Sequence, residues 1–285
     1  MLRQVSVPGI LACGMCLVIV TSGIDLSVGS ILGLSSVLFS LFTIHKGYSA
    51  FHSLALCFLI GVSVGLFAGF LITKFKLQPF MATLAMMVLL RGIAKWVSGG
   101  QKISTAIQNA DGTFRYIELP PIFAFLDHKI GGNSVAMVTV VFIFAAFFSW
   151  VILHKTYFGK HLLAVGGNEA AARLSGVNVT ATKLLAYAWC ALMATIAGIC
   201  QAVQEGQGDP ESGTGYELTA IAMVVMGGTT LAGGKGSIIT ALLGVLVIGY
   251  LEKILSLNAV PESIRLMLTG VIIVCAVLLQ KNEQP

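Results

Sequence analysis

The chain has 285 residues, of which 56% are hydrophobic and only 10% are charged. Soluble globular domains carry about 25% charged residues, and so few charges cannot cover the surface of a soluble protein of this size. The composition therefore excludes an ordinary soluble domain and predicts an integral membrane protein. The net charge of +5 does not indicate nucleic-acid binding, because the basic residues gather in short loops between apolar runs, as they do in cytoplasmic loops of membrane proteins.

Nine apolar segments approach the length of about 20 residues that a helix needs to cross a bilayer. They are Val5–Ser22, Leu26–Ile44, Ala50–Thr73, Pro79–Val97, Val135–Leu153, Leu184–Val203, Leu218–Leu231, Ser237–Leu255 and Ile264–Leu279. These segments predict an all-α, polytopic membrane protein in which residues 1–285 form a single transmembrane domain. The seventh segment is short and flanked by glycine, which predicts a broken or re-entrant helix that protein or a cavity shields from lipid.

Charges in the loops predict how the chain is oriented. The loops 73–78 and 154–183 are basic, the loop 98–134 is balanced, and the loop 204–217 carries only acidic charges. By the positive-inside rule, the two basic loops face the cytoplasm and the other two face outward. Alternation then places the C-terminus in the cytoplasm and residue 1 outside. Because no signal peptide is evident, we expect one further helix upstream of this sequence.

The cytoplasmic loop at about 155–183 contains the pattern of a short capped helix. Asn168 is a suitable N-cap, Glu169 interacts favourably with the positive end of a helix dipole, and Arg173 follows four residues later. Gly176 can end the helix. Such a helix can dock into a groove of a partner protein, or the stretch can be a solvated connection. The residues alone leave both interpretations open.

The glycine-rich stretch "GGTTLAGGKGS" at 227–237 resembles a phosphate-binding loop but lacks two of its required residues. The Walker pattern is G-x-x-x-x-G-K followed by Ser or Thr. Thr229 stands at the first glycine position, and Gly236 follows Lys235 where the magnesium-binding hydroxyl should be. We therefore expect a tight cytoplasmic turn with Lys235 at its tip. No spacing of His, Cys, Ser or carboxylates indicates chemistry, so we predict no catalytic, cofactor-binding or metal-ligating residues in this chain.

Four polar residues near the membrane segments are candidates for a translocation path. Within "TSGIDLSVGS" at 21–30, Asp25 or Ser27 either caps the helix that follows or lines the path. Arg91, near the outer end of the fourth segment, either extends toward the aqueous interface or lines a polar path. Glu217, the last acidic residue of the outer loop, completes the set.

Small residues predict where helices pack closely. Gly61, Gly65 and Gly69 are spaced by four residues and share one face of the third segment. Small residues in this arrangement let two helix backbones approach each other in lipid. Gly29 and Gly33 form a weaker pair of the same kind.

Four blocks of the sequence closely resemble the ribose-type sugar permeases of bacterial ABC importers, within the branched-chain amino acid and sugar permease superfamily. The blocks are "TSGIDLSVGS" (21–30), "TLAMMVLLRG" (83–92), "FGKHLLAVGGNEAAARLSGV" (158–177) and "GTGYELTAIAMVVMGGTTLAGGKGS" (213–237). They occur in the order that the family shows, and together they cover nearly the whole chain. Members of this family usually have about ten helices, with one more at the N-terminus than this sequence shows.

The resemblance implies a permease subunit of an ATP-driven importer, which is not itself an enzyme and carries a monosaccharide such as a pentose, a hexose or a similar polyol across the bacterial inner membrane. It implies three partners besides the lipid bilayer: a second permease subunit, identical or related; a cytoplasmic ABC ATPase, which binds ATP and Mg; and a periplasmic or lipid-anchored sugar-binding protein, which meets the acidic loop at 205–217. In this resemblance the helix that couples the permease to the ATPase consists of Gly167, Asn168, Glu169, Ala172, Arg173, Leu174, Ser175 and Gly176.

Two other functions remain open at this stage. Within the same superfamily, a permease can carry branched-chain amino acids or nucleosides instead of a sugar. A secondary transporter driven by protons or sodium ions belongs to a different class, and such carriers usually hold ionisable residues at mid-membrane depth. Only Asp25 and Arg91 are suitable for that role, which counts against ion coupling.

Overall fold

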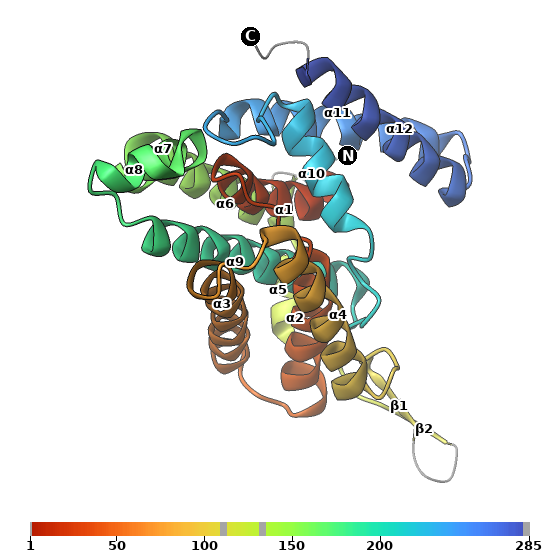
Figure 1. The fold of residues 1–285 in the computed structure, drawn as a ribbon. Helices are drawn as coiled ribbons and strands as arrows, with labels where there is room; N and C mark the ends of the chain where they lie inside the picture. Colours follow the sequence, from red (N-terminus) through yellow and green to blue (C-terminus); the bar gives the residue numbers. More distant parts are fainter. Residues whose placement is uncertain (1, 109–112, 131–134, 282–285) are drawn as a thin grey trace.

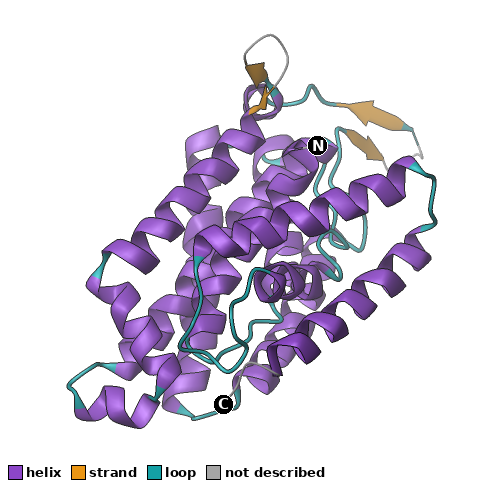
Figure 2. Ribbon diagram, turned by 90° about the horizontal axis from the view of Figure 1, so that it is seen from above, coloured by secondary structure: helices purple, strands orange, loops and turns teal. Residues whose placement is uncertain are grey.

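The computed structural model describes residues 2–108, 113–130 and 135–281 (Figure 1). Its α-helices are α1 (Leu2–Val20), α2 (Val28–Ser40), α3 (Ala50–Lys74), α4 (Pro79–Ser98), α5 (Pro121–Asp127), α6 (Met137–Lys155), α7 (Tyr157–Gly167), α8 (Glu169–Leu174), α9 (Val179–Glu205), α10 (Tyr216–Met226), α11 (Ile238–Leu257) and α12 (Glu262–Lys281). A π-helical turn, η1 (Leu41–His45), directly continues α2. Helices form the body of the molecule (Figure 2).

The helices agree with the apolar segments of the sequence. Within the described ranges, seven helices are long and apolar enough to cross a membrane: α1, α2 with η1, α3, α4, α6, α9 and α11. The two remaining segments correspond to α10 and α12. The predicted all-α, polytopic membrane fold is therefore confirmed. The seventh segment is short, as expected: α10 has 11 residues and ends at Met226, before a turn that the hydropathy alone did not separate from it.

The helices α1, α2 and α9 form the centre of the bundle. α1 packs against α6, α9, α10 and α11, and α9 packs against α1, α2 and α3. From Val5 to Val20 every residue of α1 is buried. By contrast, α3, α4, α6 and α11 each bury only part of their surface and expose large apolar side chains elsewhere. Exposed apolar faces of this kind are suited to lipid, whereas α1 and α2 are buried over most of their length and α9 over about two thirds of it.

The predicted glycine face of α3 is a close helix contact. A methyl group placed on Gly65 would lie 2.6 Å from the Ala191 side chain and 2.6 Å from the carbonyl oxygen of Tyr187, both in α9. Gly69 similarly approaches the backbone of Leu184. These glycines let α3 lie directly against the backbone of α9, as the spacing in the sequence predicted.

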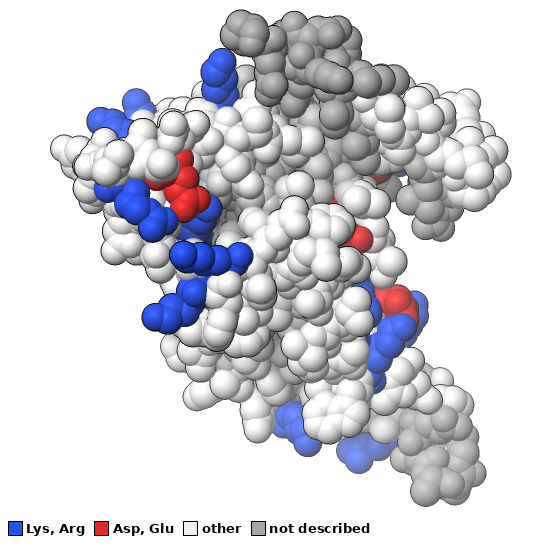
Figure 3. All heavy atoms as spheres, viewed as in Figure 1, with Lys and Arg blue, Asp and Glu red and all other residues white. Residues whose placement is uncertain are grey.

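The loops with different charges lie at opposite ends of the bundle. The loop after α3 and the stretch from α8 to the start of α9 line one common cavity. At the other end, Ile103 forms a β-bridge with Gly208, and Lys102 pairs with Asp209 at 3.0 Å. Figure 3 shows basic side chains gathered around the end that carries α8, with mixed charges toward the other end. The grouping of loops agrees with the orientation predicted from the positive-inside rule.

Among the residues that the structure describes, four short strands lie in or directly after the balanced loop 98–134, and the sequence did not predict them. β1 (Ala106–Gln108) pairs with β2 (Phe114–Tyr116), and β3 (Lys129–Ile130) pairs with β4 (Val135–Ala136), both antiparallel. Strands of two or three residues carry too little alternation of apolar and polar side chains to be recognised in a sequence. β1 and β2 lie at the edge of the molecule (Figure 1), whereas β4 contacts α1 and α6 and its Ala136 is buried.

Candidate functional site

The short helix predicted in the cytoplasmic loop is present. The N-cap of α8 is Asn168, whose side-chain oxygen accepts a hydrogen bond from the backbone N–H of Ala171 at 3.0 Å. This bond satisfies one of the N–H groups that a helix start leaves without a partner. Gly176 follows the helix with a φ of +84°, a conformation that suits glycine. At the tip, the Leu174 side chain is 90% exposed, which is unusual for leucine on a helix with a buried face.

Two cations hold Glu169 of α8. Arg173 Nη2 donates to Glu169 Oε1 at 2.9 Å within the helix, as the spacing predicted. Lys183 Nζ, in the first turns of α9, donates to Glu169 Oε2 at 2.6 Å. These hydrogen bonds, chiefly the one from Lys183, hold the pKa of the Glu169 carboxyl below its usual range. The Lys183 bond ties α8 to α9, and the sequence did not indicate it because the spacing of 14 residues is not one that a single helix brings together.

A cavity of about 450 Å³ lies beside this helix pair. Its walls combine the loop between α3 and α4 with α8 and the start of α9, and they carry Lys76, Arg173 and Lys183. The lining of this cavity therefore carries three cations and one carboxylate, Glu169, which pairs with Arg173 and Lys183. The surface next to α8 is basic and suited to an acidic partner surface.

We expect acid to weaken the link between α8 and α9. Because the pKa of Glu169 is lowered in the folded protein, its ion pairs stabilise the fold fully above about pH 4.3, the usual value of a free glutamate. That contribution is lost as the pH falls through the lowered pKa. Thermal unfolding midpoints of the protein and of Glu169→Gln should therefore differ most at pH 6, and the difference should shrink as the pH falls below about 4.3. A difference between the two unfolding midpoints that stays constant across this pH range would contradict the prediction.

The stretch "TSGIDLSVGS" forms a buried break between α1 and α2. Asp25 is fully buried, and its Oδ1 accepts hydrogen bonds from the backbone N–H of Ser27 at 2.9 Å and from its hydroxyl at 2.6 Å. Ser27 itself is the N-cap residue but forms no capping bond with its side chain. Thr83 of α4 donates to the carbonyl oxygen of Ile24 at 3.2 Å. Protein side chains thus supply the partners that lipid cannot give to a broken backbone.

A second break precedes α10. Gly208 lies against Ser36 and Ser40 of α2, and Gly213 lies against Gly29 at the opposite end of that helix. The non-helical residues 206–215 therefore run along α2, and α10 continues from there. The sequence predicted an outward-facing loop over 204–217, but part of this segment lies inside the bundle. Hydropathy did not reveal this, because a polar segment can enter the membrane only when protein shields it, and the shielding helix is distant in sequence.

Arg91 points toward this interrupted segment. Its Nη1 donates to the carbonyl oxygens of Pro210 and Ser212, the latter at 2.9 Å. Arg91 therefore bonds to the backbone of a neighbouring segment, and its role in lining a path stays a prediction. Glycines on α2 make room for these groups: Gly33 faces Arg91, and Gly29 faces the carboxylate of Glu217.

The four predicted path residues therefore lie around the first turns of α2. Asp25 and Ser27 begin the helix, Glu217 contacts its first turn, and Arg91 reaches its second. They come from three different parts of the chain, so their proximity is a property of the fold. All except Arg91 belong to, or lie next to, a break in a helix.

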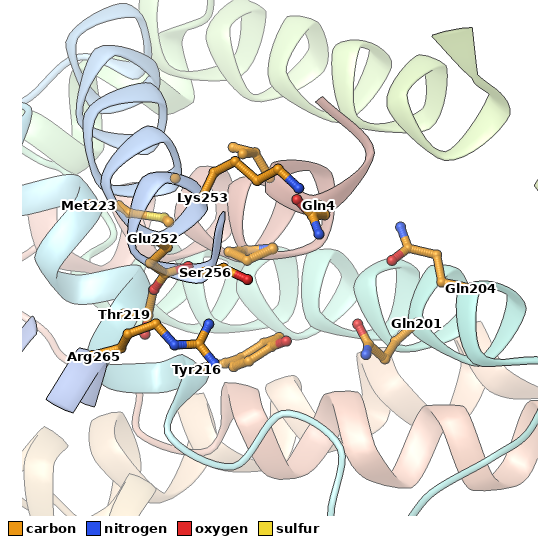
Figure 4. A pocket seen from close by; sticks show the side chains of 13 residues that line it. Gln4, Gln201, Gln204, Tyr216, Thr219, Met223, Glu252, Lys253, Ser256 and Arg265 are labelled. Atoms are coloured by element: carbon orange, nitrogen blue, oxygen red, sulfur yellow. The ribbon is translucent and has the colours of Figure 1, made fainter. Parts of the chain in front are cut away.

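A polar hollow of about 250 Å³ lies among α1, α9, α10, α11 and α12 (Figure 4). Its wall includes Gln4, Gln201, Gln204, Tyr216, Glu252 and Arg265. The sequence did not indicate these residues, because each helix contributes only one to four lining side chains. The hollow lies toward the end of the bundle that carries the acidic loop and reaches the first turn of α10.

Known transport proteins match this chain along nearly its whole length. The profile of the family described as "Branched-chain amino acid transport system / permease component" matches residues 1–277. The chain is 40% identical to the ribose import permease protein RbsC of Escherichia coli strain K12, over 99% of this chain and 85% of that protein. It is 40% identical to the ribose import permease protein RbsC of Bacillus subtilis strain 168, with coverage of 99% and 84%. It is 37% identical to the fructose import permease protein FruG of Bifidobacterium longum strain NCC 2705, with coverage of 95% and 78%.

The helical bundle has two breaks, one between α1 and α2 and one at residues 206–215 before α10. Together with its apolar spanning helices, it defines a polytopic membrane protein. The chain belongs to the family of branched-chain amino acid transport system permeases, and it is a transport subunit rather than an enzyme. The resemblance found in the sequence and the expected location in the bacterial inner membrane are confirmed. No solved structure gives a significant match to the chain.

Proposed function

We propose that this protein is the permease subunit of an ATP-driven ABC importer that carries a monosaccharide into the cell. The relatives named above are import permeases for ribose and fructose, and a xylose transport system permease of Escherichia coli is 30% identical over 97% of this chain. The observation that carries the proposal is α8, a short, capped and exposed helix that an ion pair ties to α9. A helix that transmits the movement of a partner protein must be accessible to that partner and rigidly connected to the transmembrane helices. α8 is exposed, and its ion pair connects it to α9.

The proposed assembly contains two permease subunits, two ATPase subunits and a sugar-binding protein. The ATPase docks on Gly167, Asn168, Glu169, Ala172, Arg173, Leu174, Ser175 and Gly176, and it holds the ATP and Mg. The binding protein delivers sugar at the end that carries the acidic loop. ATP binding favours one state of the permease because its contacts with α8 differ between the inward-open and outward-open states.

We place the sugar path next to the first turns of α2. The four predicted path residues meet there, next to the break between α1 and α2 and the break before α10. They are Asp25, Ser27, Arg91 and Glu217. Broken helices expose backbone polar groups, which can bind a polar substrate at membrane depth. Asp25 and Arg91 both have partners within the protein, which favours a structural and path-lining role over ion coupling.

The experiment that tests this proposal is uptake by vesicles that contain the permease, its ATPase and its binding protein. We expect ATP-dependent uptake of a monosaccharide and no uptake of leucine. Leucine uptake would support the amino-acid alternative, and uptake driven by an ion gradient without ATPase would contradict the proposal.

The exposed leucine of α8 provides a variant for the same assay. Leu174→Asp places a charge where we expect the ATPase to dock, and burying an unpaired charge there costs several kcal/mol. We expect uptake to fall at least about tenfold and the ATPase to dissociate on purification. Leu174→Met keeps an apolar side chain and should retain both properties. Normal uptake by Leu174→Asp would contradict the assignment of α8 as the coupling helix.

A further inference from the structure

Three chain segments meet at Ser22, where α1 ends. Ser22 has a φ of +61°, a conformation that residues other than glycine adopt rarely and at a cost. The other two segments are the end of α7 and the turn at 230–235 that follows α10. A strained residue at the junction of three segments requires a reason, and neither the capping role of Asp25 nor the docking role of α8 supplies one.

The hydroxyl of Ser22 is shared between the other two segments. Its Oγ lies 2.7 Å from the carbonyl oxygen of Ala232, in the turn, and 3.1 Å from the carbonyl oxygen of Gly166, in α7. A serine hydroxyl has a single proton and can donate it fully to only one acceptor at a time. The proton therefore bonds fully to either α7 or the turn, and the shorter distance is the one to the turn.

Backbone contacts at the same place are tight. The N–H of Gly234 donates to the carbonyl oxygen of Val20 at 2.9 Å. A methyl group on Gly234 would lie 2.7 Å from the Cα of Gly167, and the turn residues Gly233 and Gly234 both have positive φ values. The three backbones are therefore in direct contact, and only glycine fits at these positions.

Each of the three segments leads to a different part of the proposed machinery. α7 continues through Asn168 into α8, where we place the ATPase. The turn continues backward into α10 and the interrupted segment that Arg91 holds. α1 continues through the buried break at Asp25 into α2, where we place the sugar path. The Ser22 hydroxyl, at the end of α1, links this segment to both of the others.

We propose that Ser22 is a positioning residue that transmits the movement of the coupling helix, α8, to the break between α1 and α2 and to α10. The inference rests on the function proposed above, because it assigns a role within ATP-driven transport. When the ATPase moves α8, α7 moves with it, and the Ser22 proton shifts between Gly166 and Ala232. The ends of α1 and of the 230–235 turn then move together with the coupling helix.

The structural part of this proposal is tested by hydrogen exchange on the full chain in lipid nanodiscs, without partners. Ser22→Gly keeps a backbone that accepts a positive φ and removes the CH2OH side chain, with it the hydroxyl that bonds to both segments. We expect amide exchange to increase at least about fivefold in both 162–170 and 228–237, because the carbonyl oxygens of Gly166 and Ala232 share the Ser22 hydroxyl and both lose it. Thr21→Val is the matched control: the Thr21 hydroxyl donates only to Val18 in its own helix, so neither peptide should change. If exchange in either peptide is unchanged in Ser22→Gly, the proposal that Ser22 links α7 and the 230–235 turn is wrong.

The functional part is tested by the number of ATP molecules hydrolysed per sugar taken up in reconstituted vesicles. We expect Ser22→Gly to raise this ratio at least about fivefold while ATPase activity persists, and Thr21→Val to leave it unchanged. An unaltered ratio in Ser22→Gly would overturn the transmitting role. If the unmodified protein takes up no sugar with ATP, the proposed function fails, and the exchange experiment still decides whether Ser22 joins the three segments.

Discussion

Replacing Arg91 by methionine is expected to reduce sugar uptake at least about tenfold and to lower the thermal stability of the permease. Arg91 donates to the carbonyl oxygens of Pro210 and Ser212, which lie inside the bundle and are shielded from water. Leaving a buried acceptor without its donor costs about 1–3 kcal/mol, and here one side chain serves two acceptors. The interrupted segment should then lose its fixed position against α2. Initial uptake rates and unfolding midpoints measure the two effects.

Lys95, one turn further along α4, offers the matched control. It pairs with Glu211 of the same interrupted segment at 2.6 Å, but both side chains are about half exposed. Exposed ion pairs contribute at most about 1 kcal/mol, so Lys95→Met should change uptake by less than about threefold. If the two variants lose uptake equally, the loss reflects general removal of charge near the acidic segment, and the specific role of Arg91 is wrong.

Much of the fold could be predicted because the lipid environment requires long apolar segments, which are easily recognised in a sequence. A spanning helix must be apolar over most of its length, so each of the nine segments was visible without knowledge of its neighbours. The α8 helix was visible for a related reason: its cap at Asn168 and its Glu169–Arg173 pair are local, within four residues of each other. The glycine face of α3 was visible because helical periodicity places residues four apart on one side.

Other features could not be predicted because they depend on contacts between distant segments. The sequence shows Arg91 near the end of an apolar helix, but its orientation depends on a polar segment about 120 residues later. Lys183 follows α8 in the chain, yet only the fold brings it to Glu169. Ser22 lies in the same block as Asp25, where a lone carboxylate in apolar sequence is conspicuous and a serine is not. The distinguishing property of Ser22, its positive φ, is not visible in a sequence.

Alanine at Gly65 is expected to destabilise the permease, although alanine normally favours helices over glycine. The added methyl group would lie 2.6 Å from the Ala191 side chain and 2.8 Å from the Cα of Ala188. These atoms belong to α9, which is held on its other sides by α1 and α2 and cannot easily move away. Overpacking a close contact costs about 1–3 kcal/mol. Thermal or denaturant unfolding in detergent should show a lower midpoint.

Gly92 of α4 makes the comparison decisive. It is also a helical glycine in a spanning segment, but a methyl group there would meet no atom within 4 Å. Gly92→Ala should therefore raise the stability by up to about 1 kcal/mol, because alanine restricts the unfolded chain and favours the helix. The two identical substitutions should shift the unfolding midpoint in opposite directions. A destabilisation of equal size at both positions would mean that alanine itself is unfavourable in these helices, and that the approach of α3 to α9 does not depend on Gly65.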